Sequence, residues 1–405
     1  MFSILPPPRL HRSAHIVPIR EALEEIRAGR MIILMDDEDR ENEGDLCMAA
    51  ELVAAEHINF MATHGRGLIC LPLTEEQIDK LALPMMASEN RAWLGTAFTA
   101  SVDARGGVSG GISASDRAKT IRTAVRDGAS RSDLMSPGHV FPLRARRGGV
   151  LVRAGQTEGA VDLARLAGLK PAGVICEIMN EDGTMARLPE LERFAERHGL
   201  KIATVADLIH YRLHYDSLVQ RVASARLVSR YGGEFTAHVY RNDVDLGEDL
   251  ILVKGEITPE VPTLVRAHTE YLPGDVFGYE ERNTGALLHS AMELIAAEGK
   301  GVVLYLRRET EGRELFAGRS RAEREHPSTS PWNRLQQFRD FGIGAQILRD
   351  VGVGKIRWMT NRARRLVGLA GYGLEIVETV PISVEPSSAP EHSTDQAKTV
   401  SQLRR

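Results

Sequence analysis

Apolar residues recur along the chain with two different spacings, and these spacings predict a mixture of helices and strands. Within Pro18–Ala28 they recur at helical spacing, and Gly29 follows as a stop. Met31–Met35 is a short continuous apolar run, which is typical of a buried strand. Glu56–His64 is then predicted as a helix and Gly67–Leu73 as a strand. The chain therefore alternates between the two kinds of element from its beginning.

The same alternation continues to about residue 215. Glycines and serines mark several boundaries, because glycine ends helices and serine caps their first turns. Further helices are predicted at Thr74–Leu83, from Ser113 or Ser115 to Arg126, and at Thr157–Ala167, Pro189–His198 and Ala206–Tyr215, with strands at Phe98–Val102, Val150–Arg153 and Val174–Met179.

A second mixed unit follows residue 223. Its predicted strands are Glu234–Tyr240, Leu250–Gly255 and Val302–Arg307, and its predicted helices are Ala286–Glu298 and Gly342–Asp350. We therefore predict an α+β (mixed α/β) protein of two domains. The expected divisions are a flexible leader at 1–15, a first domain at 16–215, a linker at 216–223, a second domain at 224–384 and a disordered tail at 385–405.

Length, composition and charge narrow the class of protein. A chain of 405 residues with 43% hydrophobic content has enough apolar residues for two packed cores. Its net charge of −4 argues against general nucleic-acid binding. Three scattered cysteines exclude a disulfide framework and a thiolate-rich zinc site, and no apolar run is long enough to span a membrane. These features favour a cytoplasmic protein.

Charged residues concentrate in the segment Asp36–Asp45. It holds seven carboxylates and one arginine, directly after the apolar run Met31–Met35. Such charge density is costly without a compensating cation, and oxygen ligands of this type suit Mg²⁺ or Mn²⁺. A solvated acidic turn is the alternative explanation. The residues alone leave both open.

Three further features could carry chemistry. Residues 153–158 read Arg-Ala-Gly-Gln-Thr-Glu at a predicted helix start, where free N–H groups can bind a phosphate. His139 lies between Pro137 and Pro142, although a lone histidine is more often structural than catalytic. Glu177 falls in a strand expected to be buried, where a carboxylate is costly unless it is paired or reactive.

These residues belong to longer runs that together resemble a known family. The runs MDDEDRENEGD, HGRGLICLPL, GTAFT, PGHVFPLRAR and TEGAVDLARLAGLKPAGVICEIMNEDGTMARLPE, in this order, are similar to 3,4-dihydroxy-2-butanone 4-phosphate synthase, which supplies the four-carbon unit of riboflavin. The resemblance covers roughly residues 19–212 without large gaps.

The resemblance implies a substrate, a metal and a set of site residues. The family cleaves ribulose 5-phosphate to the butanone phosphate and formate with Mg²⁺ or Mn²⁺, and it is typically a homodimer with sites at the subunit interface. By resemblance, the residues of the site are the substrate-contacting pair Arg40 and Glu41, with Glu41 also a metal ligand, the substrate-binding Asp45, the phosphate-binding Arg153, Ala154, Gly155, Gln156 and Thr157, and the essential pair His139 and Glu177.

Two departures from the family's pattern bear on activity. The family's second metal ligand is a histidine, and its place here is taken by Gln156. The family's Thr-Thr-Gly is Ser109-Gly110-Gly111. An amide oxygen can still bind Mg²⁺, but it cannot carry a proton as imidazole does. We therefore expect a slower synthase, and the alternative is an impaired paralogue that serves binding or regulation in the riboflavin pathway.

Residues 224–384 resemble GTP cyclohydrolase II, the usual fusion partner of the synthase. That family holds zinc with three cysteines, and the matching positions here are Tyr271, Arg282 and Thr284. Because none of these is a credible zinc ligand, we expect no bound zinc and no GTP cyclohydrolase II activity. Arg339 stands at the family's catalytic arginine, but Gln337 and Arg365 replace an aspartate and a lysine. The domain is then a folded stabiliser or, alternatively, a nucleotide or flavin sensor.

Overall fold

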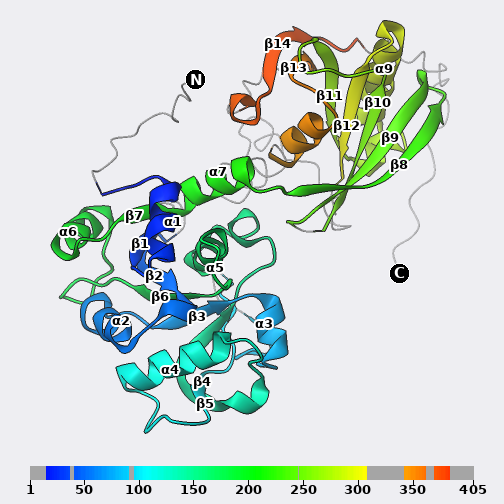
Figure 1. The fold of residues 1–405 in the computed structure, drawn as a ribbon. Helices are drawn as coiled ribbons and strands as arrows, with labels where there is room; N and C mark the ends of the chain where they lie inside the picture. The colour runs from blue at the N-terminus through cyan, green and yellow to red at the C-terminus, as the bar shows by residue number, and fades with distance from the viewer. Residues whose placement is uncertain are drawn as a thin grey trace, which may run out of the picture.

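The computed structural model describes residues 15–36, 41–90, 95–244, 246–307, 342–361 and 369–383. Two seven-stranded sheets, one in each half of the chain, are each accompanied by helices (Figure 1). The predicted two-domain α+β architecture is therefore confirmed. None of the helices within these ranges is both long and apolar enough to cross a lipid bilayer.

The first sheet mixes parallel and antiparallel strands. Its order is β4-β5-β3-β6-β2-β1-β7. β2 lies antiparallel between β1 and β6, and β5 lies parallel to β3. The strands are β1 (Ile32–Met35), β2 (Gly44–Ala49), β3 (Cys70–Leu73), β4 (Val102–Ala104), β5 (Leu134–Arg144), β6 (Gly173–Glu177) and β7 (Ile202–Thr204).

Both faces of this sheet are covered, which explains why its central strands are continuous apolar runs. Successive side chains of a strand point to opposite faces. Ile32 and Leu34 thus belong to one core with α1, α5 and α7, whereas Ile33 and Met35 belong to another with α2, α3, α4 and α6. The helices are α1 (Ile19–Arg27), α2 (Ala55–Phe60), α3 (Glu75–Lys80), α4 (Ala114–Val125), α5 (Gln156–Leu166), α6 (Leu188–His198) and α7 (Val205–Tyr215).

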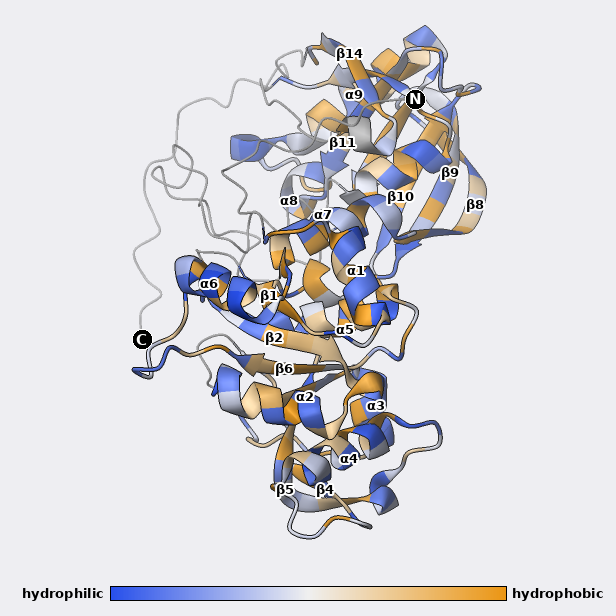
Figure 2. Cartoon of the chain, turned by 60° about the vertical axis from the view of Figure 1, so that its left-hand side comes forward, coloured by the Kyte–Doolittle hydropathy of each residue, from blue (hydrophilic) through white to orange (hydrophobic). Residues whose placement is uncertain are grey.

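The second sheet has the order β14-β13-β11-β12-β10-β9-β8. In Figure 2 polar and apolar residues alternate along β9, as expected for a strand with one solvated face, whereas β8 is exposed along most of its length. The elements are β8 (Val219–Ser229), β9 (Gly233–Asn242), β10 (Glu248–Lys254), β11 (Thr263–Thr269), β12 (Gly301–Leu306), β13 (Lys355–Met359), β14 (Glu375–Val380), α8 (Leu272–Asp275), α9 (Thr284–Glu298) and a helix at 342–350.

The predicted strand at Val150–Arg153 is wrong. The structure has a 3₁₀ turn at Gly149–Leu151 there. Gly148 and Gly149 both have left-handed φ angles, of 83° and 63°, so the chain turns instead of extending. The N–H of Val150 donates to the Asp162 carboxylate at 2.9 Å and is not available to a neighbouring strand.

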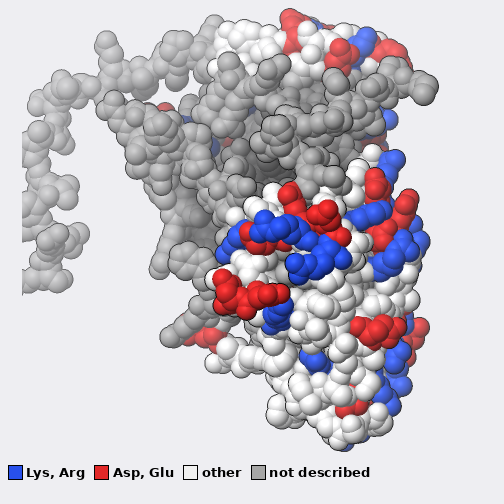
Figure 3. Space-filling model, turned by 90° about the vertical axis from the view of Figure 1, so that its left-hand side faces the viewer, with Lys and Arg blue, Asp and Glu red and all other residues white. Residues whose placement is uncertain are grey.

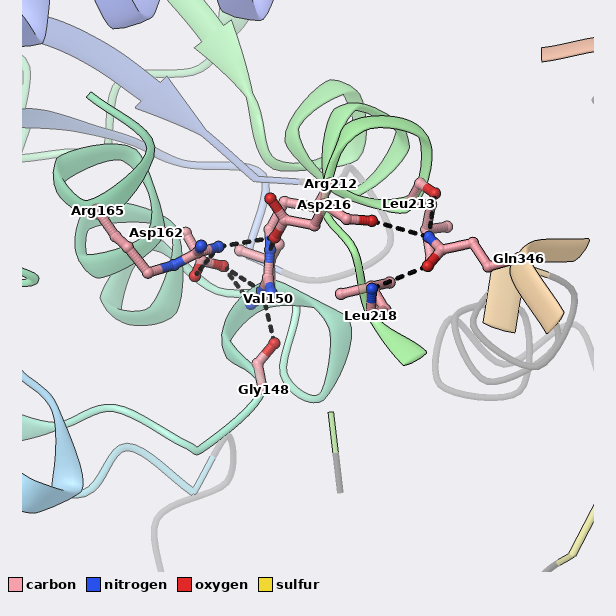
Figure 4. A network of polar contacts seen from close by, with 9 residues as sticks. All are labelled: Gly148, Val150, Asp162, Arg165, Arg212, Leu213, Asp216, Leu218 and Gln346. Carbon is pink, nitrogen blue, oxygen red and sulfur yellow. Dashed lines mark hydrogen bonds and ion pairs between the residues drawn. The ribbon is translucent and has the colours of Figure 1, made fainter. Parts of the chain in front are cut away.

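The two halves meet through a polar network and a shared apolar core (Figure 4). The Gln346 side chain of the second half accepts from the N–H of Leu218 at 2.8 Å and donates to the carbonyls of Leu213 and Asp216 at 2.9 and 3.0 Å. Arg212 of α7 in turn bonds to Asp162 of α5 at 2.9 Å. Gln346 therefore ties the second half to the end of α7, and Arg212 ties α7 to α5 within the first half.

Candidate active site

Asp36, directly after β1, holds the described part of the acidic segment by hydrogen bonds. The buried Asp36 carboxylate accepts from the N–H groups of Glu41 and Glu43, at 3.2 and 2.9 Å. Asn42 between them has a left-handed φ of 54°, a conformation that asparagine tolerates better than most residues. Arg40 and residues 37–39 lie outside the described residues. The sequence therefore folds back on its own first carboxylate and begins β2 at Gly44.

Two acidic residues are paired on adjacent strands where this turn ends. The β2–β6 ladder pairs Asp45 with Glu177. Burial raises the pKa of Asp45, and the charges of Glu177 and Glu41 raise it further. Burial also raises the pKa of Glu43, with Glu41 as the next cause. The described residues thus gather negative charge here, and Arg187 compensates part of it at Glu43.

This donor set fits a hard divalent cation. Carboxylate and amide oxygens are the ligands that Mg²⁺ and Mn²⁺ prefer. The amide oxygen of Asn42 is buried in the same turn without a hydrogen-bond partner in the described structure, so it has an unused lone pair for a ligand. No group of three or more His, Cys, Asp or Glu side chains in metal-holding geometry occurs within the described ranges.

The start of α5 lies against the acidic turn. Gln156 is buried, and its side-chain N–H₂ donates to the carbonyl of Glu43 at 3.4 Å. Arg153 bonds to the buried Glu158 at 2.6 Å and to the Thr96 hydroxyl at 3.1 Å. Because Glu158 compensates the arginine's charge, an anion here would rely on the free N–H groups of the helix start as well. The structure thus brings the predicted acidic and phosphate-binding segments into contact.

His139 is oriented by a residue that the sequence did not single out. The backbone N–H of His139 donates to Asp103 at 3.0 Å, and its Nδ1 lies 2.8 Å from the other carboxylate oxygen. A carboxylate accepts, so this contact favours a proton on Nδ1 and leaves Nε2 for other partners. A Cβ at Gly111 would come within 2.5 Å of His139 Nδ1 and 2.2 Å of the carboxylate, which explains the glycine.

Glu177 is likewise held by its backbone surroundings. One carboxylate oxygen accepts from the N–H of Leu68 at 2.8 Å. A Cβ at Gly67 would lie 2.6 Å from the same oxygen, so this close approach requires glycine. β3 pairs Cys70 with Phe141 of β5 and with Ile175 of β6. His139 and Glu177 each lie two residues beyond these pairs, at the same end of the sheet.

The residues that the resemblance aligns with zinc cysteines lie near Asp275, which Tyr271 and Thr284 contact directly. Its carboxylate is bonded by His268 at 2.9 Å, the Thr284 hydroxyl at 2.5 Å, the Tyr271 N–H at 2.9 Å and the Tyr305 hydroxyl at 2.9 Å. Burial opposes its ionisation, but the hydrogen bonds outweigh burial and lower the pKa of Asp275 to about 2.

The same cluster does not fit zinc. The Arg282 guanidinium lies over the Tyr271 ring, 4.1 Å from its centroid, and would repel a dication. The Thr284 hydroxyl already donates to Asp275. Gln337, Arg339 and Arg365 lie outside the described residues, so the remaining expected positions of this domain are not placed.

Comparison with known proteins gives a consistent assignment. The sequence profile of 3,4-dihydroxy-2-butanone 4-phosphate synthase matches residues 20–211, and that of GTP cyclohydrolase II matches residues 220–381. "Riboflavin biosynthesis protein RibBA" of Aquifex aeolicus is 52% identical over 91% of this chain and 93% of its own length. The Bacillus subtilis protein of the same name is 48% identical over 94% of this chain and 96% of its own.

A solved structure also covers both domains. The crystal structure of "RibBX, a two domain 3,4-dihydroxy-2-butanone 4-phosphate synthase from A. baumannii" aligns with a TM-score of 0.70 and 41% identity. The alignment covers 91% of this chain and 100% of that one.

Proposed function

This chain belongs to the riboflavin biosynthesis family in which a 3,4-dihydroxy-2-butanone 4-phosphate synthase domain is fused to a GTP cyclohydrolase II domain, and from this we propose that its first domain converts D-ribulose 5-phosphate to the butanone phosphate and formate while its second lacks GTP cyclohydrolase II activity. The protein is accordingly a lyase-type enzyme of riboflavin biosynthesis. The observation that carries the proposal is the Asp45–Glu177 carboxylate pair between the acidic turn and the start of α5.

Each part of this arrangement has a role in the proposed reaction. Glu41 and Gln156 would hold Mg²⁺ or Mn²⁺, and Arg40 would contact the substrate. Arg153, Ala154, Gly155 and Thr157 bind its phosphate at the α5 start. A bound divalent ion polarises adjacent substrate oxygens.

Proton transfer falls to the buried carboxylates and to His139. Because the pKa of Asp45 is raised by burial and by Glu177, the pair holds a proton more readily than two exposed carboxylates. Glu177 is then free to accept a proton from the substrate while Asp45 binds substrate hydroxyls. His139, held by Asp103, presents Nε2 as a second proton acceptor.

We also propose a cytoplasmic homodimer. The family resemblance supports the dimer. Cys47, Cys70 and Cys176 are free and buried, which suits a reducing compartment. On the face drawn in Figure 3, acidic and basic groups are interleaved, and they form no continuous basic surface of the kind that binds nucleic acid. Chemical crosslinking or sedimentation would test the dimer directly.

Formate release from ribulose 5-phosphate with Mg²⁺ or Mn²⁺ tests the synthase activity. We expect metal-dependent release by the wild type and faster release by Gln156→His, since imidazole can both bind the ion and carry a proton. No formate from the wild type would refute the synthase proposal. No gain in Gln156→His would refute only the explanation that Gln156 slows the reaction.

The proposed inactivity of the second domain rests on the Asp275 cluster. Two of its donors, Tyr271 and Thr284, are residues that the resemblance aligns with the cyclohydrolase cysteines, and a similar chain is described as a two-domain synthase. Other relatives carry the bifunctional name, so the assay is needed. We expect neither stoichiometric zinc nor formate from GTP. Finding both would overturn this part of the proposal.

Gln156 favours one second candidate, a catalytically impaired paralogue that acts in binding or regulation. The substitution removes an imidazole from the proposed metal site. Rescue of a riboflavin auxotroph that lacks the synthase separates the two functions. A working synthase restores growth without riboflavin, and an impaired paralogue does not.

A further inference from the structure

Arg187, at the start of α6, forms hydrogen bonds with the backbone of the acidic turn. Its guanidinium Nη1 donates to the carbonyls of Glu41 and Asn42, at 2.5 and 2.6 Å, and lies 3.6 Å from the Glu43 carboxylate. These two carbonyls belong to the peptide planes on either side of Asn42, so one cation bound to both restrains the φ and ψ angles of this residue. Asn42 has a left-handed backbone, which costs free energy unless the surroundings hold it.

The backbone at Arg187 is itself held by hydrogen bonds. Its backbone N–H donates to the Glu190 carboxylate at 3.2 Å, as in a capping box, and Pro189 follows at the helix start. The preceding N–H of Ala186 donates to the carbonyl of Ile178 at 3.0 Å. A guanidinium projecting from such a helix start has little freedom to leave the turn.

The same anchor reaches the strand that carries Glu177. The N–H of Ile178, the next residue, donates to the carbonyl of Gly44 at the end of the turn, at 3.1 Å. A Cβ at Gly44 would lie 2.6 Å from Leu191 of α6, so the helix is pressed directly against this point. The turn, Glu177 and Arg187 therefore form one mechanically connected unit.

We propose that Arg187 is a positioning residue, which holds the Glu41–Glu43 turn in the conformation that binds the divalent ion. Part of its effect is electrostatic, because the guanidinium lies 3.6 Å from the Glu43 carboxylate. The rest is geometric, because the backbone from which Glu41 projects is fixed by two hydrogen bonds. The proposal rests on the metal-binding role of Glu41 in the proposed function.

The test compares Arg187→Gln and Arg187→Lys with Arg193→Gln. Arg193 lies on the same helix, is exposed, and pairs only with Glu190 among the described contacts. Mn²⁺ binding without substrate is measured by electron paramagnetic resonance, and amide hydrogen exchange is followed in peptides covering residues 41–48. We expect Arg187→Gln to weaken Mn²⁺ binding about tenfold, the scale seen when groups that orient metal ligands are lost, and to speed exchange in the turn.

Lysine keeps the charge but lacks the planar fork, so Arg187→Lys should fall between wild type and Arg187→Gln. Arg193→Gln should match the wild type. Unchanged Mn²⁺ binding and unchanged hydrogen exchange in Arg187→Gln would overturn the proposal. If Arg187→Gln does not fold, wild-type Mn²⁺ affinity in Arg187→Lys would overturn it instead. Wild-type protein that binds Mn²⁺ but releases no formate would refute the proposed function and leave the role of Arg187 standing.

Discussion

Asp45 and Asp275 are both buried carboxylates near a strand end, yet their surroundings differ completely. Asp45 faces Glu177 and lies near Glu41, and burial together with these charges raises its pKa. Asp275 accepts four hydrogen bonds, and its pKa falls to about 2. The first arrangement keeps unused negative charge available for a cation. The second satisfies its charge within the protein.

The contrast separates a site that can bind a cation, around Asp45, from a cluster that only stabilises the second domain, around Asp275. In the first domain, Asn42 has a buried amide oxygen without a partner among the described residues. Around Asp275, Tyr271 and Thr284 donate hydrogen bonds to the carboxylate, and Arg282 covers the Tyr271 ring. The hydrogen bonds of this carboxylate therefore lie within the protein.

The largest expected effect is on catalysis. Glu177→Gln should lower formate release by at least about 100-fold, the usual scale for loss of a proton-transfer group. The free energy of unfolding should not fall, because the change removes one of two adjacent negative charges. Glu181→Gln, a nearby exposed position, serves as the control. Urea unfolding and a formate assay measure the two quantities, and a joint fall in both would make Glu177 a structural residue.

The opposite result is expected at Asp275. Asp275→Ala leaves buried donors unpaired and should lower the unfolding free energy of the second domain by about 3 kcal/mol. Hydrogen exchange in β12 reports this loss, and formate release per folded molecule should change little. The exposed Glu280→Ala provides the control. If β12 exchange stays at the wild-type rate, the Asp275 cluster does not stabilise the domain.

The contributions of Asp45 and Asp275 to stability should change with pH in opposite directions. The raised pKa of Asp45 contributes stability below about pH 4 that is lost as pH rises through its folded value, so this group's contribution to the first domain rises on acidification from neutral pH. The lowered pKa of Asp275 contributes stability above 3.8 that is lost as pH falls toward about 2. Hydrogen exchange followed separately in each domain, from neutral pH down to about pH 2, measures both contributions to stability. Parallel changes in the two domains would contradict the comparison.

The smallest expected effect is removal of one donor. Tyr305→Phe deletes one of the four hydrogen bonds to Asp275 and should cost about 1 kcal/mol in the second domain. Tyr231→Phe tests the same chemical change where the ring stacks on His289 and has no described bond to a carboxylate. Thermal unfolding compares them. Equal losses would show that the cluster holds no special hydrogen bond.

Local sequence signals predicted much of the fold, and they failed where tertiary contacts decide. The helix at Thr157–Ala167 was predicted from its apolar spacing and flanking glycines, and α5 lies there. The long strand β5 was not predicted, because Pro137 and Pro142 interrupt it. Pro142 is tolerated there since it contributes its carbonyl, which accepts from the N–H and hydroxyl of Thr99.

The candidate site shows the same division. The acidic segment and Glu177 were visible in the sequence as acidic residues beside apolar strands, and the family resemblance then singled out Glu41 and Asp45 as candidates. Arg187 and Asp103 were not, because each acts on a residue far away in the chain. The Arg187–Glu41 contact spans 146 positions, and the Asp103–His139 contact spans 36. No periodicity or local motif encodes such a pairing.

The shared core at the junction has a consequence for the gene. Leu213, Leu218 and Ile343 belong to a single apolar cluster, and Gln346 holds the carbonyls at the end of α7. A gene shortened after Tyr215 would encode a protein with that apolar surface bare, and a destabilised protein of this kind is a target for chaperones and proteases. Selection can therefore preserve the second domain for the sake of the first, whether or not it has chemistry of its own.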